Sequence, residues 1–101
     1  MNHEYQYMVD FTIPKILPED FLRLIPHQRA KVNRFFREGK LINYALSLDN
    51  SKMWAVISAN SEEDVASLLK ELPLTRFMKY HVNMLTFYNA VGQEKQVFSM
   101  N

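Results

Sequence analysis

Histidine is the residue type in this sequence best suited to moving a proton near neutral pH, because its ordinary pKa is about 6.5. His27 lies in a segment with helical periodicity and His81 in an extended segment, so each is a candidate general base. The helical pattern turns His27 toward a charged, solvated side. His81 alternates with Lys79 and Asn83 on a mixed strand face. For His81, a pocket residue and a polar interface residue are both open interpretations.

Gln28 is the polar residue most directly aimed at the predicted core. It lies near the centre of the apolar side of the same helix, which carries Phe21, Leu24 and Val32. Two interpretations remain: an amide that hydrogen-bonds a ligand, or a core glutamine satisfied by backbone or water. Because an amide cannot act as a base, Gln28 would orient a ligand without reacting with it.

Four further residues are candidates for ligand binding. Tyr44 and Trp54 stand on two predicted neighbouring strands, where aromatic side chains either line a pocket or fill the core. Lys31 and Arg76 would attract the charge of an anionic ligand. The first helix is basic and the second acidic, so we expect their charges to complement each other, with an anion site at a pocket mouth as the alternative.

Several kinds of chemistry are disfavoured by composition. The chain of 101 residues has no cysteine, so it has no disulfide, thiolate nucleophile or cysteine-based zinc site. The histidines show no metal-ligand spacing, and two glycines form no phosphate-binding loop. We therefore expect neither a metal nor a cofactor.

The overall charge and hydropathy also limit the partners. A formal charge of +1 gives no general attraction to nucleic acid or to a membrane surface. No apolar run approaches the roughly 20 residues that span a membrane, and the N-terminus lacks the pattern of a signal peptide. We expect a soluble, cytoplasmic protein that binds neither nucleic acid nor membrane.

The helices and strands that carry these candidate residues can be predicted from hydrophobic periodicity and from residues that typically end a helix. Apolar residues alternate over 5–13, and the spacing predicts helices over about 18–38 and 61–72. Pro26 should kink or divide the first helix, Gly39 should cap its end, and Ser61 with Asp64 resembles a capping box. Strands are predicted over 41–48, 53–59 and 77–91, the first two joined as a hairpin by Asp49-Asn50-Ser51.

This order predicts an α+β, ferredoxin-like βαββαβ domain over residues 1–91, followed by a tail over 92–101. Its antiparallel four-stranded sheet would have strand order 4-1-3-2 and both helices on one face. The third strand is apolar on both faces. We expect Met53, Ala55 and Ile57 to lie on the uncovered face, so that sheet-to-sheet pairing with a second copy would bury them. The tail would pack on that partner.

Three segments resemble the muconolactone isomerase family. They are Arg37-Glu38-Gly39, the run Leu72-Pro73-Leu74 with Phe77-Met78 and Val82, and the strand Tyr7–Ile13 followed by Pro14. The resemblance implies a dimeric α/β barrel with a small-molecule pocket between each sheet and its helices. It also implies isomerisation of a lactone double bond by proton transfer, without metal or cofactor.

The chain departs from this family in having no Asp or Glu between Phe21 and Arg37, where the resemblance implies a carboxylate. The expected function is therefore a homodimer, or a higher oligomer, that binds a small lactone, carbonyl or carboxylate ligand. If it is an enzyme, it would be a cofactor-free isomerase with His27 or His81 as base. The alternatives are a cofactor-free monooxygenase-like barrel and a non-catalytic dimeric domain whose pocket is filled by its own side chains.

Overall fold

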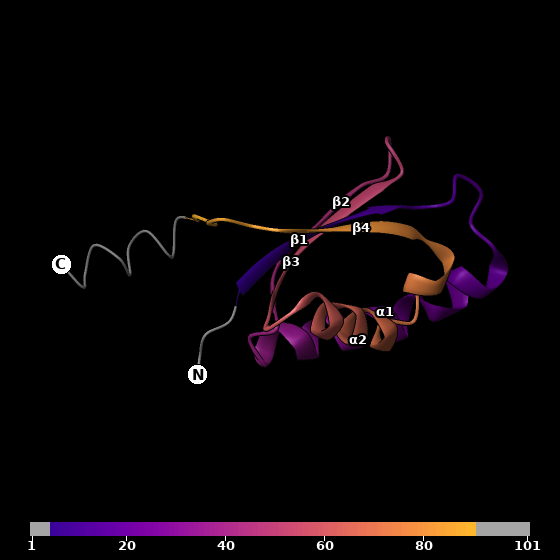
Figure 1. Cartoon of the computed structure of the whole chain (residues 1–101). Helices are drawn as coiled ribbons and strands as arrows, with labels where there is room; N and C mark the ends of the chain where they lie inside the picture. Colours follow the sequence, from indigo (N-terminus) through magenta and orange to yellow (C-terminus); the bar gives the residue numbers. More distant parts are fainter. Residues whose placement is uncertain (1–4, 91–101) are drawn as a thin grey trace.

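The computed structural model describes residues 5–90, and its elements follow the predicted order (Figure 1). The predicted tail over 92–101 lies outside the described residues. Strands and helices are β1 (Tyr5–Thr12), α1 (Glu19–Arg37), β2 (Leu41–Ser47), β3 (Lys52–Ala59), α2 (Glu62–Glu71), the single-turn 3₁₀ helix η1 (Thr75–Phe77) and β4 (Lys79–Met84).

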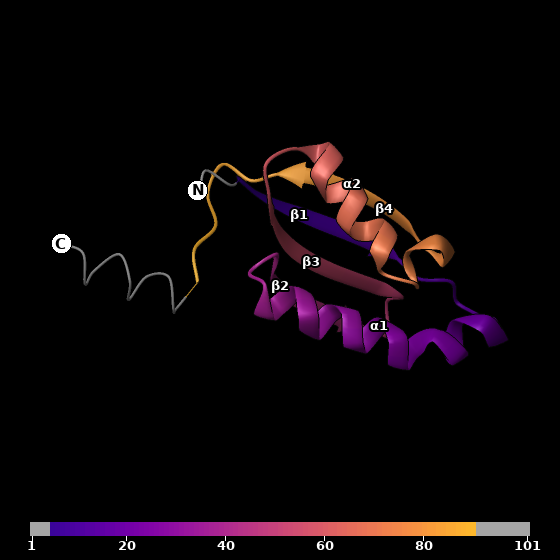
Figure 2. The same ribbon diagram turned by 90° about the horizontal axis from the view of Figure 1, so that it is seen from below.

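The strands form one antiparallel sheet in the order β2-β3-β1-β4. This is the predicted order 4-1-3-2 read from the opposite edge. Both helices lie on the same side of the sheet (Figure 1), and they run next to each other across it (Figure 2). The predicted ferredoxin-like α+β fold is therefore confirmed.

The first helix is a single element, so the predicted alternative of two segments divided at Pro26 is wrong. Pro26 lies inside α1, which continues to Arg37. Proline has no N–H for the carbonyl of Leu22, one turn earlier. Leu22 is half exposed, so water can reach this turn. The apolar face of α1, anchored by Phe21 and Phe35, packs into the core on both sides of the proline.

Gly39 ends α1 as predicted. Its φ of +74° is a left-handed conformation that glycine adopts without steric cost. The N–H of Lys40 donates to the carbonyl of Phe35 at 2.9 Å, and that of Gly39 donates to Phe36 at 3.1 Å. This is a Schellman motif, which satisfies carbonyls that the helix end would otherwise leave unpaired.

The second helix begins at a side-chain cap. Ser61 Oγ accepts a hydrogen bond from the N–H of Asp64 at 3.1 Å, as predicted. The reciprocal bond of a capping box is altered, because Asp64 Oδ2 accepts from the N–H of Asn60 at 3.2 Å. Aspartate is shorter than the glutamate of a usual capping box, and its carboxylate here bonds the N–H of the residue before Ser61 instead of the N–H of Ser61 itself.

The predicted face assignment of β3 is wrong. Met53, Ala55 and Ile57 lie beneath the helices in the main core, whereas Trp54 and Val56 lie on the uncovered face. Alternation along a strand separates two faces but does not say which one the helices cover. The pairing with β1 determines which face of β3 lies under the helices. The odd-numbered residues of β1 are buried, and they pair with the odd-numbered residues of β3.

A register shift at the start of β2 changes which of its first residues face the helices. Leu41 pairs with Ile57, and the next paired residue is Asn43. The extra residue, Ile42, is a β-bulge that changes the alternation. Leu41 rather than Ile42 therefore enters the core, while Tyr44, two residues beyond the bulge, lies on the side of the helices.

The last strand is shorter than the predicted 77–91. Its first predicted residue, Phe77, belongs to η1, and β4 ends at Met84. One further backbone bond extends the pairing, from the N–H of Leu85 to the carbonyl of Gln6 at 2.8 Å. Because β1 begins at Tyr5, the described part of β1 offers no partner beyond this point.

Candidate functional site

A cavity of about 620 Å³ lies between α1 and the β2–β3 hairpin. Its volume falls within the range of about 300–1,000 Å³ that small-molecule sites occupy. Apolar side chains from α1, both hairpin strands and the connection around η1 form most of its wall: Ile13, Leu17, Phe21, Ile25, Val32, Phe36, Leu46, Leu48, Met53, Leu74 and Met78. Four polar residues complete the lining, namely Gln28, Arg29, Asn33 and Tyr44.

Gln28 and Tyr44 form the polar pair of this cavity. Gln28 is 4% exposed, and its Nε2 donates to Tyr44 Oη at 3.0 Å. Its Oε1 accepts from the N–H of Leu74 at 3.1 Å. The amide is therefore a satisfied core group, and it also holds the Tyr44 hydroxyl at the cavity wall. These bonds fit the interpretation of Gln28 as a core glutamine, and hydrogen bonding of its amide to a ligand stays a prediction.

The hydroxyl of Tyr44 has a hydrogen-bond donor that the described chain does not use. Because Oη accepts from Gln28, the O–H of Tyr44 is available to donate to something else. Among residues 5–90, no group accepts that proton in a hydrogen bond. Burial raises the pKa of Tyr44, and the hydrogen bond from Gln28 opposes this only in part. At neutral pH the residue is a neutral hydrogen-bond donor, suited to an oxygen acceptor.

The mouth of the cavity is both apolar and cationic. Phe36, Leu46 and Leu48 are exposed by 42%, 55% and 72% although they line the cavity. Arg29 and Asn33 are exposed on the adjacent face of α1. A ligand would thus meet apolar surface and a guanidinium at the entrance, and the tyrosine hydroxyl farther in.

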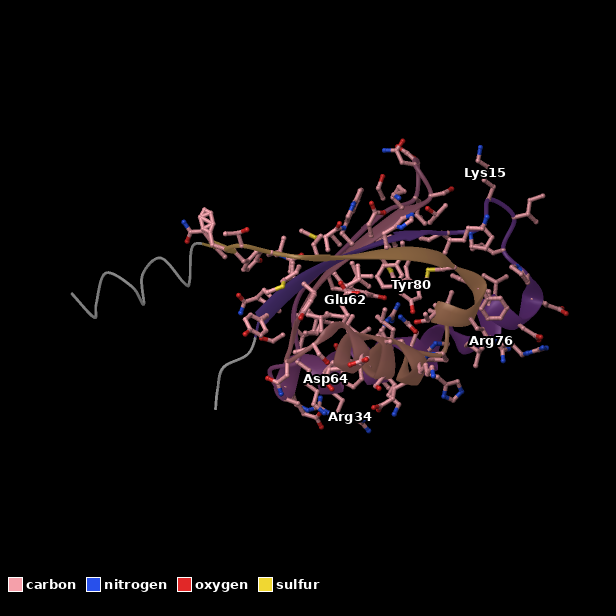
Figure 3. All side chains as sticks on the ribbon, viewed as in Figure 1. Lys15, Arg34, Glu62, Asp64, Arg76 and Tyr80 are labelled. Atoms are coloured by element: carbon pink, nitrogen blue, oxygen red, sulfur yellow. The ribbon has the colours of Figure 1, made fainter. Side chains whose placement is uncertain are left out.

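His27 and Lys31 lie elsewhere, in a separate surface depression between α1 and α2. Glu71 of α2 pairs there with Lys31 at 3.5 Å and with Arg34 at 2.9 Å. Arg34 lies on the side of the helices that faces away from the sheet (Figure 3). The expected charge complementarity between the two helices is thus present, and it engages the lysine that was a candidate for binding an anion.

The other predicted site residues are also outside the cavity. Trp54 and His81 flank Asp10 as its cross-strand neighbours, on the sheet face opposite the helices. The guanidinium of Arg76 lies over the ring of Phe77, 4.7 Å from its centroid, at the end of the molecule where η1 lies (Figure 3). Of the predicted set, the structure brings together only Gln28 and Tyr44.

Arg29 and Asn33 are the polar lining residues that the sequence interpretation missed. Arg29 follows Gln28 directly, so the same helical pattern that pointed Gln28 at the sheet places Arg29 about 100° around α1. That position borders the apolar face, and the signal was therefore present in the spacing. Within residues 5–90, no three histidine, aspartate or glutamate side chains gather as metal ligands would. Neither described helix has the length and apolarity to cross a membrane.

Comparisons with known proteins agree on one family. The family model of muconolactone delta-isomerase matches residues 3–90. A crystal structure of muconolactone isomerase at 3.3 Å resolution superimposes with a TM-score of 0.67 at 22% sequence identity, covering 84% of this chain and 92% of that chain. This likeness shows the fold. No curated protein sequence matches the chain.

Proposed function

Because the chain belongs to the muconolactone isomerase family, we propose that it binds a small organic molecule in the cavity between α1 and the β2–β3 hairpin. The ligand carries a lactone, carbonyl or carboxylate oxygen. The observation that supports this most directly is the hydrogen bond from Gln28 to Tyr44, because it orients a hydroxyl whose own proton has no acceptor among the described residues.

The chemistry of this donor matches an oxygen acceptor. Tyr44 stays protonated at neutral pH, since burial raises its pKa above the ordinary value of 10.0. A neutral O–H beside apolar walls makes a stronger hydrogen bond than it would in water, because the local dielectric is lower. The hydroxyl therefore selects ligands that place a carbonyl-type oxygen beside Tyr44 and apolar groups against the walls.

Cofactor-free isomerisation by proton transfer is the second candidate, and family membership favours it. Tyr44 would stabilise the negative charge that develops on a carbonyl oxygen when a neighbouring carbon loses a proton. The reaction also needs a base. No aspartate, glutamate or histidine lines the described cavity. His27 and His81, the proposed bases, lie outside it, so the arrangement supports ligand binding more directly than turnover.

The cavity can be compared with the two alternative functions, a non-catalytic dimeric domain and a cofactor-free monooxygenase-like barrel. A non-catalytic domain with a closed pocket would have Phe, Met and Trp side chains filling the space that the described residues leave open. A monooxygenase-like barrel would need room for a polycyclic substrate, and a volume of about 620 Å³ provides it. The apolar lining with Tyr44 and Gln28 on its wall, more than the volume, supports a ligand-binding protein over a purely structural one.

We propose in addition that the chain forms a homodimer through the uncovered face of the sheet. Met8 and Trp54 lie half-buried on that face, which carries no helix (Figure 1), whereas Val56 on the same face is already buried within the chain. Lys52 contacts the Asp10 carboxylate there, so two charges of this face already neutralise each other. Pairing two such faces would give the dimeric α/β barrel that the sequence resemblance implies.

A ligand-stabilisation screen with muconolactone, small lactones and aromatic acids tests the binding proposal. A ligand at 100 times its dissociation constant should raise the stability by about 2.7 kcal/mol. Tyr44→Phe should weaken binding of the lactones, whereas Tyr5→Phe, an exposed tyrosine outside the cavity, should not. Absence of any shift across the screen would overturn the proposal.

A further inference from the structure

We propose that Arg29 anchors a ligand carboxylate at the cavity mouth, and that the ligand's apolar body is larger than one lactone ring. The proposed class of ligand is an amphipathic carboxylic acid. It has an extended aliphatic or aromatic body and a carbonyl-type oxygen at the end opposite its carboxylate. This inference rests on the proposed binding function, and it adds the ligand's size, its polarity and the residue that selects it.

The walls of the cavity determine the body of the ligand. Eleven of its fifteen lining residues are apolar, and they extend from buried Phe21 and Met53 to exposed Leu46 and Leu48. A one-ring lactone rich in oxygen would leave most of this surface in contact with water. Each apolar group that covers such surface contributes about 25 cal/mol for every Å² removed from water. The lining therefore favours a longer or wider apolar ligand.

The exposed apolar residues at the mouth extend this surface outward. Phe36 comes from α1, whereas Leu46 and Leu48 come from the opposite, hairpin side. They lie on the two sides of the entrance and remain largely solvent-exposed in the isolated chain. A ligand that reached from the interior to the mouth would contact both sides.

Charge decides which end of the ligand lies outward. Arg29 is the one charged residue that lines the described cavity, and no ion pair engages it within residues 5–90. The other candidate cations are already in contact with neighbours: Lys31 with Glu71, and Arg76 with the Phe77 ring. A carboxylate at the mouth would meet an available guanidinium, which binds carboxylates with two parallel hydrogen bonds.

The spacing on α1 fixes the orientation of the bound acid. Gln28 and Arg29 are consecutive, with Gln28 buried toward the sheet and Arg29 exposed. Gln28 holds Tyr44 at the inner end of the ligand path, and Arg29 stands at the outer end. The ligand's carbonyl-type oxygen therefore points inward and its carboxylate outward. Arg29 acts as a specificity-determining residue and takes no part in proton transfer.

The test measures, by calorimetry, binding of 5-oxohexanoic, 7-oxooctanoic and 9-oxodecanoic acids, which carry a ketone near the far end. Decanoic acid, which lacks the ketone, and 1-decanol, which lacks both the ketone and the carboxylate, are measured beside them. Affinity for the acids should rise by up to about fourfold for each added methylene, since burying one contributes about 0.8 kcal/mol. Arg29→Gln should weaken binding of decanoic acid by up to about fivefold, the range of an exposed ion pair, and leave 1-decanol unchanged. Arg23→Gln is the matched control, because Arg23 is an exposed arginine of α1 outside the cavity.

Two results would overturn the inference while leaving the proposed function intact. One is an affinity that does not change with chain length, although lactones bind and Tyr44→Phe weakens them. The other is an equal loss of decanoic acid binding in Arg29→Gln and Arg23→Gln, which would indicate a general effect of net charge. If neither acids nor lactones bind, the binding proposal and this inference fail together.

Discussion

Gln28 Nε2 donates to Tyr44 Oη at 3.0 Å while Gln28 Oε1 accepts from the Leu74 N–H at 3.1 Å. One buried amide thus joins α1, β2 and the connection between α2 and η1. The same two bonds stabilise the fold and hold a hydroxyl at the cavity wall. Changes at this position should therefore alter stability and binding together.

Gln28→Leu should lower the free energy of unfolding by about 1–3 kcal/mol. Leucine has a similar size but makes neither hydrogen bond, so the N–H of Leu74 and the Tyr44 hydroxyl lose their partner in a buried place. Chemical denaturation measures the loss. Asn33→Leu, an exposed change on the same helix, is the control and should stay within about 0.5 kcal/mol. Equal effects of the two changes would contradict the structural role of Gln28.

The stability of the fold should depend on pH through Tyr44 only in alkaline solution. Burial raises its folded pKa above the ordinary 10.0, so the unfolded chain loses this proton first as pH rises. The stabilisation is complete below the unfolded pKa and is lost as pH rises toward the folded one. Unfolding of wild type and Tyr44→Phe between about pH 8 and pH 11 measures the difference.

Tyr5→Phe supplies the control for that experiment, because it removes one phenol from an exposed position. Tyr44→Phe should flatten the alkaline decline in stability relative to wild type more than Tyr5→Phe, because Tyr5 contributes only a smaller part of the raised pKa of its neighbour Tyr7. If both variants lost stability in parallel with wild type, Tyr44 would titrate alike in the folded and unfolded chains.

Gly39→Ala should destabilise the chain by about 1–2 kcal/mol through the backbone alone. A Cβ at this position would meet nothing within 4 Å, so the cost comes from the φ of +74° and not from a clash. Gly39→Asn should cost less, because asparagine tolerates the left-handed conformation better than alanine. Comparing the two in thermal unfolding separates the contributions. A larger loss with asparagine would contradict this explanation.

Trp54→Glu should weaken the proposed homodimer without disturbing the cavity. Trp54 lies on the uncovered sheet face, so a new carboxylate there would be exposed to water in the monomer and would have to be desolvated in a dimer. Light scattering at micromolar concentration measures the mass. Leu48→Glu, at an exposed apolar residue of the cavity mouth, is the control and should leave the mass unchanged. A monomeric wild type would refute dimerisation.

Local patterns predicted the elements of this fold well. Period-two alternation identified β1, and helical spacing identified α2 together with its Ser61 cap. Gly39 marked the end of α1 because a left-handed residue is needed there. These features depend on residues within a few positions of each other. The alternative that Pro26 divides the helix was wrong, because the apolar face of α1 packs against the core on both sides of the proline.

The candidate site was predictable only in part. The position of Gln28 on the apolar side of its helix indicated an inward-facing amide, and the structure places it there. Its partner, Tyr44, is 16 residues away along the chain. It faces the cavity because the bulge at Leu41 and Asn43 changes the alternation of β2. Trp54 and His81 carried similar signals, but their strands turn them to the opposite face.

The order of elements, their approximate ends and the direction of Gln28 could be predicted from residues close together in the sequence, since each depends on short-range periodicity or on one residue's backbone preference. The face of β3 that the helices cover and the cation that remains at the cavity mouth became clear only in the folded chain. Both follow from contacts between distant segments: β1 pairing with β3, and Glu71 engaging Lys31 while Arg29 stays unpaired within the described chain. Alternation along a strand shows which residues share a face of the sheet, but only packing against the helices shows which of the two faces is buried.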